Sequence, residues 1–126
     1  MKNIAVVLSG CGAKDGTEIT EAVSTLLTLS ELKVGYEIFA PNLDFPSTHH
    51  LTLEDQNPRN ALAEAARIAR GKIKDLQLLE VKSFDGLVFP GGYGVARNLC
   101  DWVKKGAQCQ VLPQVRHIIE EFFAQS

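Results

Sequence analysis

Residues 86–94 read GLVFPGGYG, a short apolar run that leads directly into a glycine-rich turn. Apolar runs of this length, bounded by turn residues, are typical of buried strands. Two similar runs, residues 4–8 and 36–40, come earlier in the chain. The first of them is apolar throughout and rich in β-branched side chains, a composition that favours a parallel strand covered on both faces. The sequence therefore predicts three strands, over residues 4–8, 36–40 and 84–89.

Helical spacing of apolar residues and helix-end signals predict the elements between these strands. Asp15, followed by Glu18 three residues later, resembles a capping box at the start of a helix. Asn57 and Pro58 have the residue types favoured at an N-cap and at the first helical position, and Gly71 is a helix-end signal. Residues 42–56 are predicted to form a long loop. Four helices are expected, over residues 17–32, 57–71, 95–105 and 113–123.

The alternation of strands and helices predicts a single α/β domain, residues 1–126, with a mainly parallel sheet. Two glycine turns, residues 10–12 and 91–94, each follow a predicted strand directly. The carboxyl ends of parallel strands meet at one edge of the sheet, where ligands of open α/β folds bind. Both turns are therefore expected to line one binding edge.

The composition excludes several classes of protein. Of 126 residues, 45% are hydrophobic and 22% charged, which suits one soluble domain with a real core. The net charge of −2 does not indicate a nucleic-acid binder. No apolar run approaches the roughly 18 residues that span a membrane. Cys11, Cys100 and Cys109 are odd in number and form no CxxC pair, so free thiols and a cytoplasmic location are predicted.

Familiar cofactor motifs are weak in this chain. Gly10, Gly12 and Gly16 give GxGxxxG, one residue longer than the dinucleotide fingerprint. There is no P-loop, and His49 and His50 lack further ligands at metal-binding spacing. No cofactor and no metal are therefore expected.

Three longer stretches carry a family resemblance: VVLSGCGAKDGTEITEA, RNALAEAARIARGKI and FPGGYGVARNL. They resemble, in order and spacing, the N-terminal half of the ElbB-type (enhancing lycopene biosynthesis) proteins. Those proteins belong to the ThiJ/PfpI superfamily, with a class I glutamine amidotransferase-like fold. The resemblance implies a flavodoxin-like three-layer sandwich and a connection with isoprenoid biosynthesis. It also implies a site in which an acidic residue faces a cysteine on a strand-to-helix turn, as in glyoxalase-like handling of small reactive carbonyl compounds.

The resemblance assigns roles residue by residue. Glu18 falls at the family's acidic position, and Cys11 lies beside the pocket. The amides of the turn at Gly91 and Gly92 would hold an oxyanion, with Gly10 and Gly12 on the facing turn. Further matches would build one pocket wall: His50, Arg59, Asn60 and Glu64.

The sequence departs from the family pattern at its end. In the family, the helix that matches residues 113–123 is followed by a strand and the cysteine turn, whereas this sequence ends at EEFFAQS. Cys100 and Cys109 fall in the wrong places to replace that cysteine. The expectation is a domain truncated before the nucleophile strand, inactive alone, and completed by a partner chain or paired in a homodimer.

Several alternatives stay open at this point. The glycine turns could be only tight turns, Glu18 could be only a helix cap, and Cys11 could be an inert buried thiol rather than a reactive one. Tyr93 and Trp102 are predicted to be packing residues. The competing function is a non-catalytic α/β module that binds a small anion or a protein.

Overall fold

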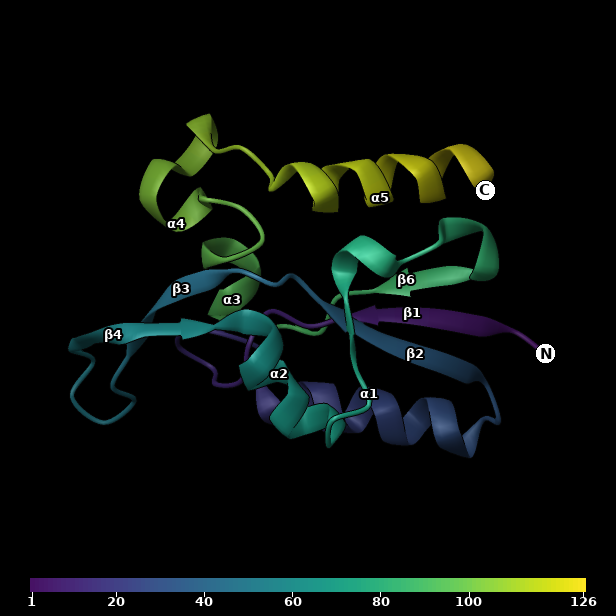
Figure 1. Cartoon of the computed structure of the whole chain (residues 1–126), viewed down its shortest axis with the longest axis horizontal. Helices are drawn as coiled ribbons and strands as arrows, with labels where there is room; N and C mark the ends of the chain where they lie inside the picture. Colours follow the sequence, from purple (N-terminus) through teal and green to yellow (C-terminus); the bar gives the residue numbers. More distant parts are fainter.

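A computed structural model describes residues 1–126, with strands and helices alternating along the chain (Figure 1). The strands are β1 (Asn3–Val7), β2 (Gly35–Ala40), β3 (Asp44–Thr48), β4 (Asp55–Asn60), β5 (Lys74–Asp75) and β6 (Gly86–Val88). The α-helices are α1 (Ile19–Glu31), α2 (Ala61–Ala69), α3 (Tyr93–Arg97), α4 (Trp102–Lys105) and α5 (Pro113–Gln125). Three short 3₁₀ turns complete the chain: η1 (Leu76–Leu78), η2 (Val81–Ser83) and η3 (Gly106–Gln108).

The central sheet is parallel, with the strand order β5-β2-β1-β6. β1 lies between β2 and β6, with Ile4 opposite both Tyr36 and Gly86. The expected α/β fold with a mainly parallel sheet is thus confirmed. The expected third strand is shorter than predicted, because only Gly86–Val88 pair with β1.

Alternate residues of β1 face opposite sides of the sheet, which explains its unbroken apolar sequence. Ala5 and Val7 pack in one core cluster with Val115 and Ile118 of α5. Val6 packs in a second cluster that includes residues of α1 and α2. The sheet therefore lies between α5 on one face and α1 with α2 on the other, a three-layer sandwich (Figure 1). No helix combines the length and the apolar character needed to cross a bilayer.

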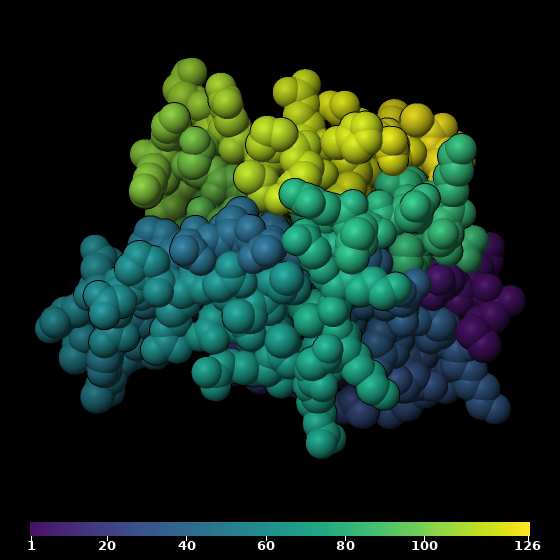
Figure 2. All heavy atoms as spheres, in the orientation of Figure 1, coloured from purple at the N-terminus to yellow at the C-terminus, as the bar shows by residue number.

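The predicted loop at residues 42–56 and the predicted helix start at Asn57–Pro58 are both wrong. The chain instead forms an antiparallel hairpin of β3 and β4, with Phe45 opposite Arg59 and a register shift between Phe45 and Ser47. Phe45 and Ser47 are buried on one face, and the Ser47 hydroxyl donates to the Asn57 carbonyl at 2.6 Å. Cross-strand pairing thus overrides the local capping signal. In Figure 2 the hairpin projects at the left of the molecule.

Helix α2 consequently begins three residues later than Pro58. Its N-cap is Asn60, whose side-chain oxygen accepts from the Ala63 amide at 2.9 Å. The helix ends at Ala69, where Arg70 takes a left-handed conformation just before the predicted stop at Gly71.

The capping box predicted at Asp15 is also wrong. Glu18 itself is the N-cap of α1, and its carboxylate accepts from the Glu21 amide at 2.8 Å. Asp15 is buried and accepts from the Thr48 amide at 2.7 Å, so it ties the first glycine turn to the hairpin.

The single helix predicted over residues 95–105 is interrupted between α3 and α4. Leu99 is buried, and its carbonyl accepts from the Leu112 amide at 2.9 Å. The backbone of Cys100 pairs with that of Val111 in an isolated antiparallel β-bridge. Tertiary hydrogen bonds thus take the backbone groups that a continuous helix would use. Helix α5 begins at Pro113, as predicted.

Candidate functional site

The two glycine turns meet at the carboxyl edge of the sheet. β1 and β6 are neighbours, and both point toward the hairpin and α3 (Figure 1). The Glu18 amide, at the end of the first turn, donates to the Gly91 carbonyl at 2.8 Å. The two turns therefore lie at one edge of the sheet, as predicted, and Glu18 contacts residues 90–92, which we call the PGG turn. We refer to Glu18, Gly91 and Gly92 as the glycine rim.

Gly92 is required where the two turns touch. Its φ of 114° is a conformation that residues with a side chain rarely adopt. A Cβ atom there would overlap the Gly16 carbonyl and lie 2.5 Å from the Glu18 nitrogen. The close approach fixes where the PGG turn sits relative to Glu18.

The backbone amides of the PGG turn are unoccupied donors. Neither the Gly91 nor the Gly92 amide donates a hydrogen bond to a backbone or side-chain acceptor of this chain, although both residues are half-buried. Backbone amides that have no acceptor within the chain are the usual components of an oxyanion hole.

Glu21 also lies against the PGG turn, and the sequence interpretation missed it. Its carboxylate occupies the space that a Cβ atom at Gly91 would need. Glu21, in the first turn of α1, therefore brings a carboxylate to the PGG turn, whereas Glu18 contacts that turn through its backbone amide.

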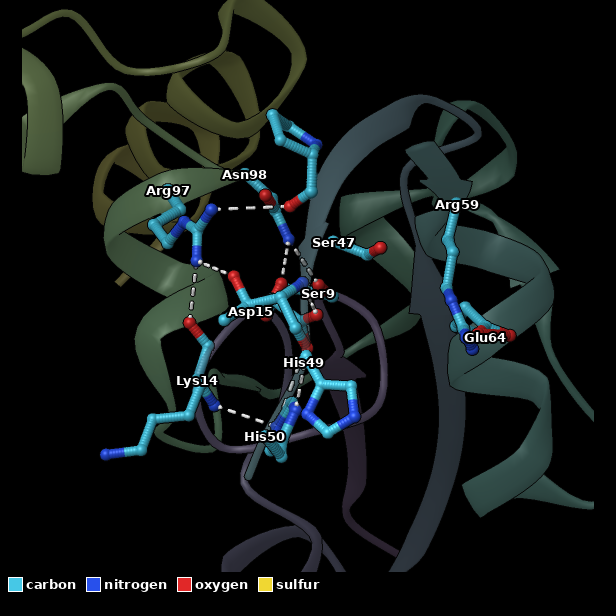
Figure 3. A network of polar contacts seen from close by, with 12 residues as sticks. Ser9, Lys14, Asp15, Ser47, His49, His50, Arg59, Glu64, Arg97 and Asn98 are labelled. Carbon is cyan, nitrogen blue, oxygen red and sulfur yellow. Dashed lines mark hydrogen bonds and ion pairs between the residues drawn. The ribbon is translucent and has the colours of Figure 1, made fainter. Parts of the chain in front are cut away.

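A second group of predicted residues gathers on the other side of the first glycine turn. Cys11, Asp15, His50, Arg59 and Glu64 line a pocket of about 200 Å³ between this turn, the hairpin and α2. Glu64 accepts from the Arg59 guanidinium at 2.8 Å (these two side chains are at the right of Figure 3). We call this the Cys11 pocket.

Arginines on both sides of Glu64 hold it ionised. Besides the bond from Arg59, it accepts from Arg67 Nε at 3.0 Å. The hydrogen bond from Arg59 is the main cause that lowers the pKa of Glu64, opposed by partial burial. Arg59, Glu64 and Arg67 therefore form an ion-pair cluster beside the Cys11 pocket.

His50 forms hydrogen bonds through both of its ring nitrogens. Its Nε2 accepts from the Lys14 amide at 3.2 Å, which leaves Nδ1 to donate to the Thr48 carbonyl at 3.0 Å (Figure 3). The His50 ring also leaves no room for a side chain at position 12, because a Cβ atom at Gly12 would lie 2.7 Å from His50 Nε2. His50 thus joins the first glycine turn to the hairpin.

The remaining predicted residues have structural positions. Gly10 has a φ of 116° and packs against Gly16 and the Phe45 ring. The Asn60 amide group donates to Asn42 Oδ1 at 2.8 Å, while its oxygen caps α2. Neither residue lines the Cys11 pocket.

The Cys11 thiol is disfavoured as a thiolate. Burial raises its pKa, the negative charges of Glu64 and Asp15 raise it further, and Arg67 opposes them. Because the thiolate is the reactive form, this environment supports the inert reading of Cys11.

We expect Cys11 to react slowly with iodoacetamide at neutral pH, because its raised pKa leaves little thiolate. For the same reason, its labelling rate should still increase with pH where an ordinary thiol is already fully ionised. Glu64→Gln removes the charge that raises the Cys11 pKa most, so it should speed labelling at pH 7. Mass spectrometry of labelled peptides measures this, with Cys100 and Cys109 as internal comparators. Fast labelling of Cys11 below pH 7 would contradict it.

Arg97 and Asn98 were not recognised from the sequence as site residues. Asn98 is buried, and its amide group donates to the carbonyls of Ser9 and Asp15, both at 2.8 Å. Arg97 donates to the Lys14 carbonyl at 2.8 Å (Figure 3). Both side chains hold the first glycine turn against α3. Residues 95–99, VARNL, contain both polar side chains, but the sequence interpretation placed this segment inside a longer helix and assigned the two residues no role.

Comparison with known proteins tests the family resemblance. No family model matches the chain. The "glutamine amidotransferase-like class 1 domain-containing protein 3, mitochondrial" of Homo sapiens is 44% identical, over 94% of this chain and 46% of its own length. The "ES1 protein homolog, mitochondrial" of Rattus norvegicus gives the same values. The "ES1 protein, mitochondrial" of Danio rerio is 37% identical over 95% of this chain. This chain thus spans about half the length of these relatives.

A solved structure agrees with these relatives. An Ehrlichia chaffeensis protein, named an isoprenoid biosynthesis protein with an amidotransferase-like domain, has a TM-score of 0.91 and 41% identity. The match covers 98% of this chain and 59% of that one.

One prediction is overturned by these comparisons. The curated relatives are all named mitochondrial proteins, so the predicted cytoplasmic location is wrong. The thiol count on which it rested reports a reducing environment and does not distinguish one such compartment from another. The family resemblance itself is confirmed: the chain is a homologue of the glutamine amidotransferase-like class 1 (ES1) proteins and has the amidotransferase-like fold of an ElbB-type isoprenoid biosynthesis protein.

Proposed function

We propose that residues 1–126 provide the carboxylate and backbone-amide half of an amidotransferase-like class I site that acts on small carbonyl compounds. The observation that carries the proposal is the glycine rim. The Glu18 amide is bonded to the Gly91 carbonyl, while the Gly91 and Gly92 amides stay free beside it. The amides would stabilise the oxyanion formed when a carbonyl carbon is attacked, and a carboxylate would move the proton.

The proposed nucleophile comes from residues outside these 126. Cys11 lines the other pocket, and its pKa is raised rather than lowered. Cys100 lies in the connection between α3 and α4, and its thiol donates a hydrogen bond to the Val95 carbonyl at 3.4 Å. The Ehrlichia chaffeensis protein is named an isoprenoid biosynthesis protein. As part of the proposal, we infer that this chain also acts in isoprenoid biosynthesis.

The 126-residue chain alone is therefore expected to consume no methylglyoxal above a heat-denatured control. Each oxyanion donor supplies only on the order of 10²–10³ in rate, which is too little without a covalent nucleophile. Turnover that survives purification and disappears in Cys11→Ser would move the chemistry to Cys11.

A second assay tests the positive side of the proposal. This chain is fused to the part of the Ehrlichia chaffeensis protein that lies outside the match. Methylglyoxal consumption by the fusion protein is then measured. Glu18→Gln should then lower turnover by about 10²-fold or more. Thr20→Ala, at an exposed position two residues after Glu18, is the matched control and should keep activity.

A non-catalytic module that binds an anion or a protein is the second candidate. The raised pKa of Cys11 favours it, because the chain then holds no activated thiol. A folded fusion without turnover, whose Glu18→Gln variant behaves identically, would support this candidate over the enzyme.

A further inference from the structure

A larger pocket lies beyond the glycine rim, between the hairpin and helices α3 and α4. Its volume is about 460 Å³, within the range of small-molecule sites. Glu18, Gly91, Gly92 and Cys11 are not among its lining residues, so it is distinct from the glycine rim and from the Cys11 pocket. We call it the Arg97 pocket.

Arg97 is a fixed cation in the wall of this pocket. One guanidinium nitrogen donates to the Lys14 carbonyl at 2.8 Å and to the Thr48 hydroxyl at 2.9 Å, and the other donates to the Pro46 carbonyl at 3.3 Å. These three bonds join α3 to the first glycine turn and to the hairpin (Figure 3). All three acceptors are neutral, and Arg97 forms no salt bridge. Its charge is positioned but not neutralised.

The other charged groups leave the pocket positive. Lys14 and Lys104 also line it, and neither forms a salt bridge. The two acidic lining residues are Asp55 and Asp101. Asp101 is already paired with Lys105 at 3.4 Å and accepts from the Gln110 amide at 2.7 Å. Three cations therefore face one acidic group that has no partner.

Apolar side chains form the rest of the wall and are left open to solvent. Leu53, Tyr93 and Val103 line the pocket and are 59%, 55% and 47% exposed. The Lys14 amine lies 5.9 Å from the centre of the Tyr93 ring, so cationic and aromatic groups stand together. Exposed apolar groups around a polar centre are typical of a ligand site.

We propose that the Arg97 pocket binds a small molecule that carries one phosphate or carboxylate group on a short apolar body. The anionic group lies against Arg97, within reach of Lys14 and Lys104. The apolar body packs on Tyr93, Leu53 and Val103. Planar guanidinium groups match both anions, and the remaining N–H groups of Arg97 are free to donate to them.

The test is an NMR titration of the ¹⁵N-labelled 126-residue chain with three probes of similar size. These are phenyl phosphate, benzoate and the neutral benzyl alcohol. Phenyl phosphate or benzoate should shift the amides of Lys14, Thr48 and Arg97, with a Kd of roughly 0.1–10 mM. Benzyl alcohol should bind at least about tenfold more weakly. The order of the two anions identifies a phosphate or a carboxylate site.

Variants separate the pocket from general charge attraction. Lys14→Gln with Lys104→Gln should weaken binding of the better anion by about tenfold, since both side chains are exposed and can be changed without unfolding the chain. Lys82→Gln, an exposed lysine in η2 that does not line the pocket, is the control and should leave the Kd unchanged.

Three results would each overturn the proposal. They are the absence of any shift at these amides, equal affinity for benzyl alcohol and the anions, and equal loss of affinity in the lysine double variant and in Lys82→Gln. Because no readout depends on turnover or on Glu18, failure here is distinguishable from failure of the proposed carbonyl chemistry.

Discussion

Gly92→Ala is expected to destabilise the chain by at least about 3 kcal/mol. The backbone at this position has a φ of 114°, where a side chain is strained. The added methyl group would also meet the Gly16 carbonyl and the Glu18 amide, which are backbone atoms that cannot rotate away. The two turns would have to separate, and the bond from the Glu18 amide to the Gly91 carbonyl would be lost.

Chemical denaturation followed by circular dichroism measures this effect. Gly106→Ala is the matched control, because Gly106 also has a positive φ, 55°, but has nothing within 4 Å of the added methyl group. Backbone strain alone should cost the control about 1–3 kcal/mol, less than Gly92→Ala, in which strain and overlap add. Equal losses in the two variants would show that the contact between the turns contributes nothing beyond backbone strain.

The 126-residue chain is expected to associate through α5 and the edge of the sheet, as a dimer of two copies. β6 pairs with β1 and lies at the end of the strand order, so its outer edge is open to another strand. Helix α5 buries Val115 and Ile118, but Phe123 is 82% exposed and Ile119 is 43% exposed. Ile118 belongs to the core, so it is not available to such an interface.

Light scattering with size-exclusion chromatography tests this expectation. Burying each such side chain contributes roughly 1.5–3 kcal/mol, so Phe123→Asp should shift the chain toward the monomer at the same concentration. Ala124→Asp adds the same charge at the neighbouring exposed position and should leave the mass unchanged. A monodisperse monomer at high concentration, with no response to Phe123→Asp, would exclude the dimer.

Local sequence patterns were sufficient for the elements whose apolar faces are continuous. The unbroken run at residues 4–8 predicted a strand covered on both faces, and β1 is that strand. Pro113 predicted the start of α5. The glycine rim was also predictable, because each turn directly follows a parallel strand and neighbouring parallel strands end at one edge.

Local patterns failed where distant segments supply the hydrogen-bond partners. Asn57 and Pro58 carry a helix-start signal, but the hairpin pairs this segment with β3 and buries Phe45 and Ser47. The break between α3 and α4 has the same cause, because the Leu99 carbonyl accepts a hydrogen bond from the Leu112 amide and not from a residue of a continuing helix. A capping preference contributes about 1 kcal/mol, which tertiary pairing and burial exceed.

The sequence by itself determined the layered α/β class, the positions of β1, β2 and β6 along the chain and the glycine turns at one edge, because these follow from short-range periodicity and from backbone conformations that only glycine tolerates. Only the tertiary structure decided which side chains stand together. It moved Asp15 from a helix cap to a link with the hairpin, separated Cys11 from the glycine rim, and placed Arg97 in a pocket without a carboxylate partner. These arrangements depend on contacts between residues more than 30 positions apart, which no local pattern encodes.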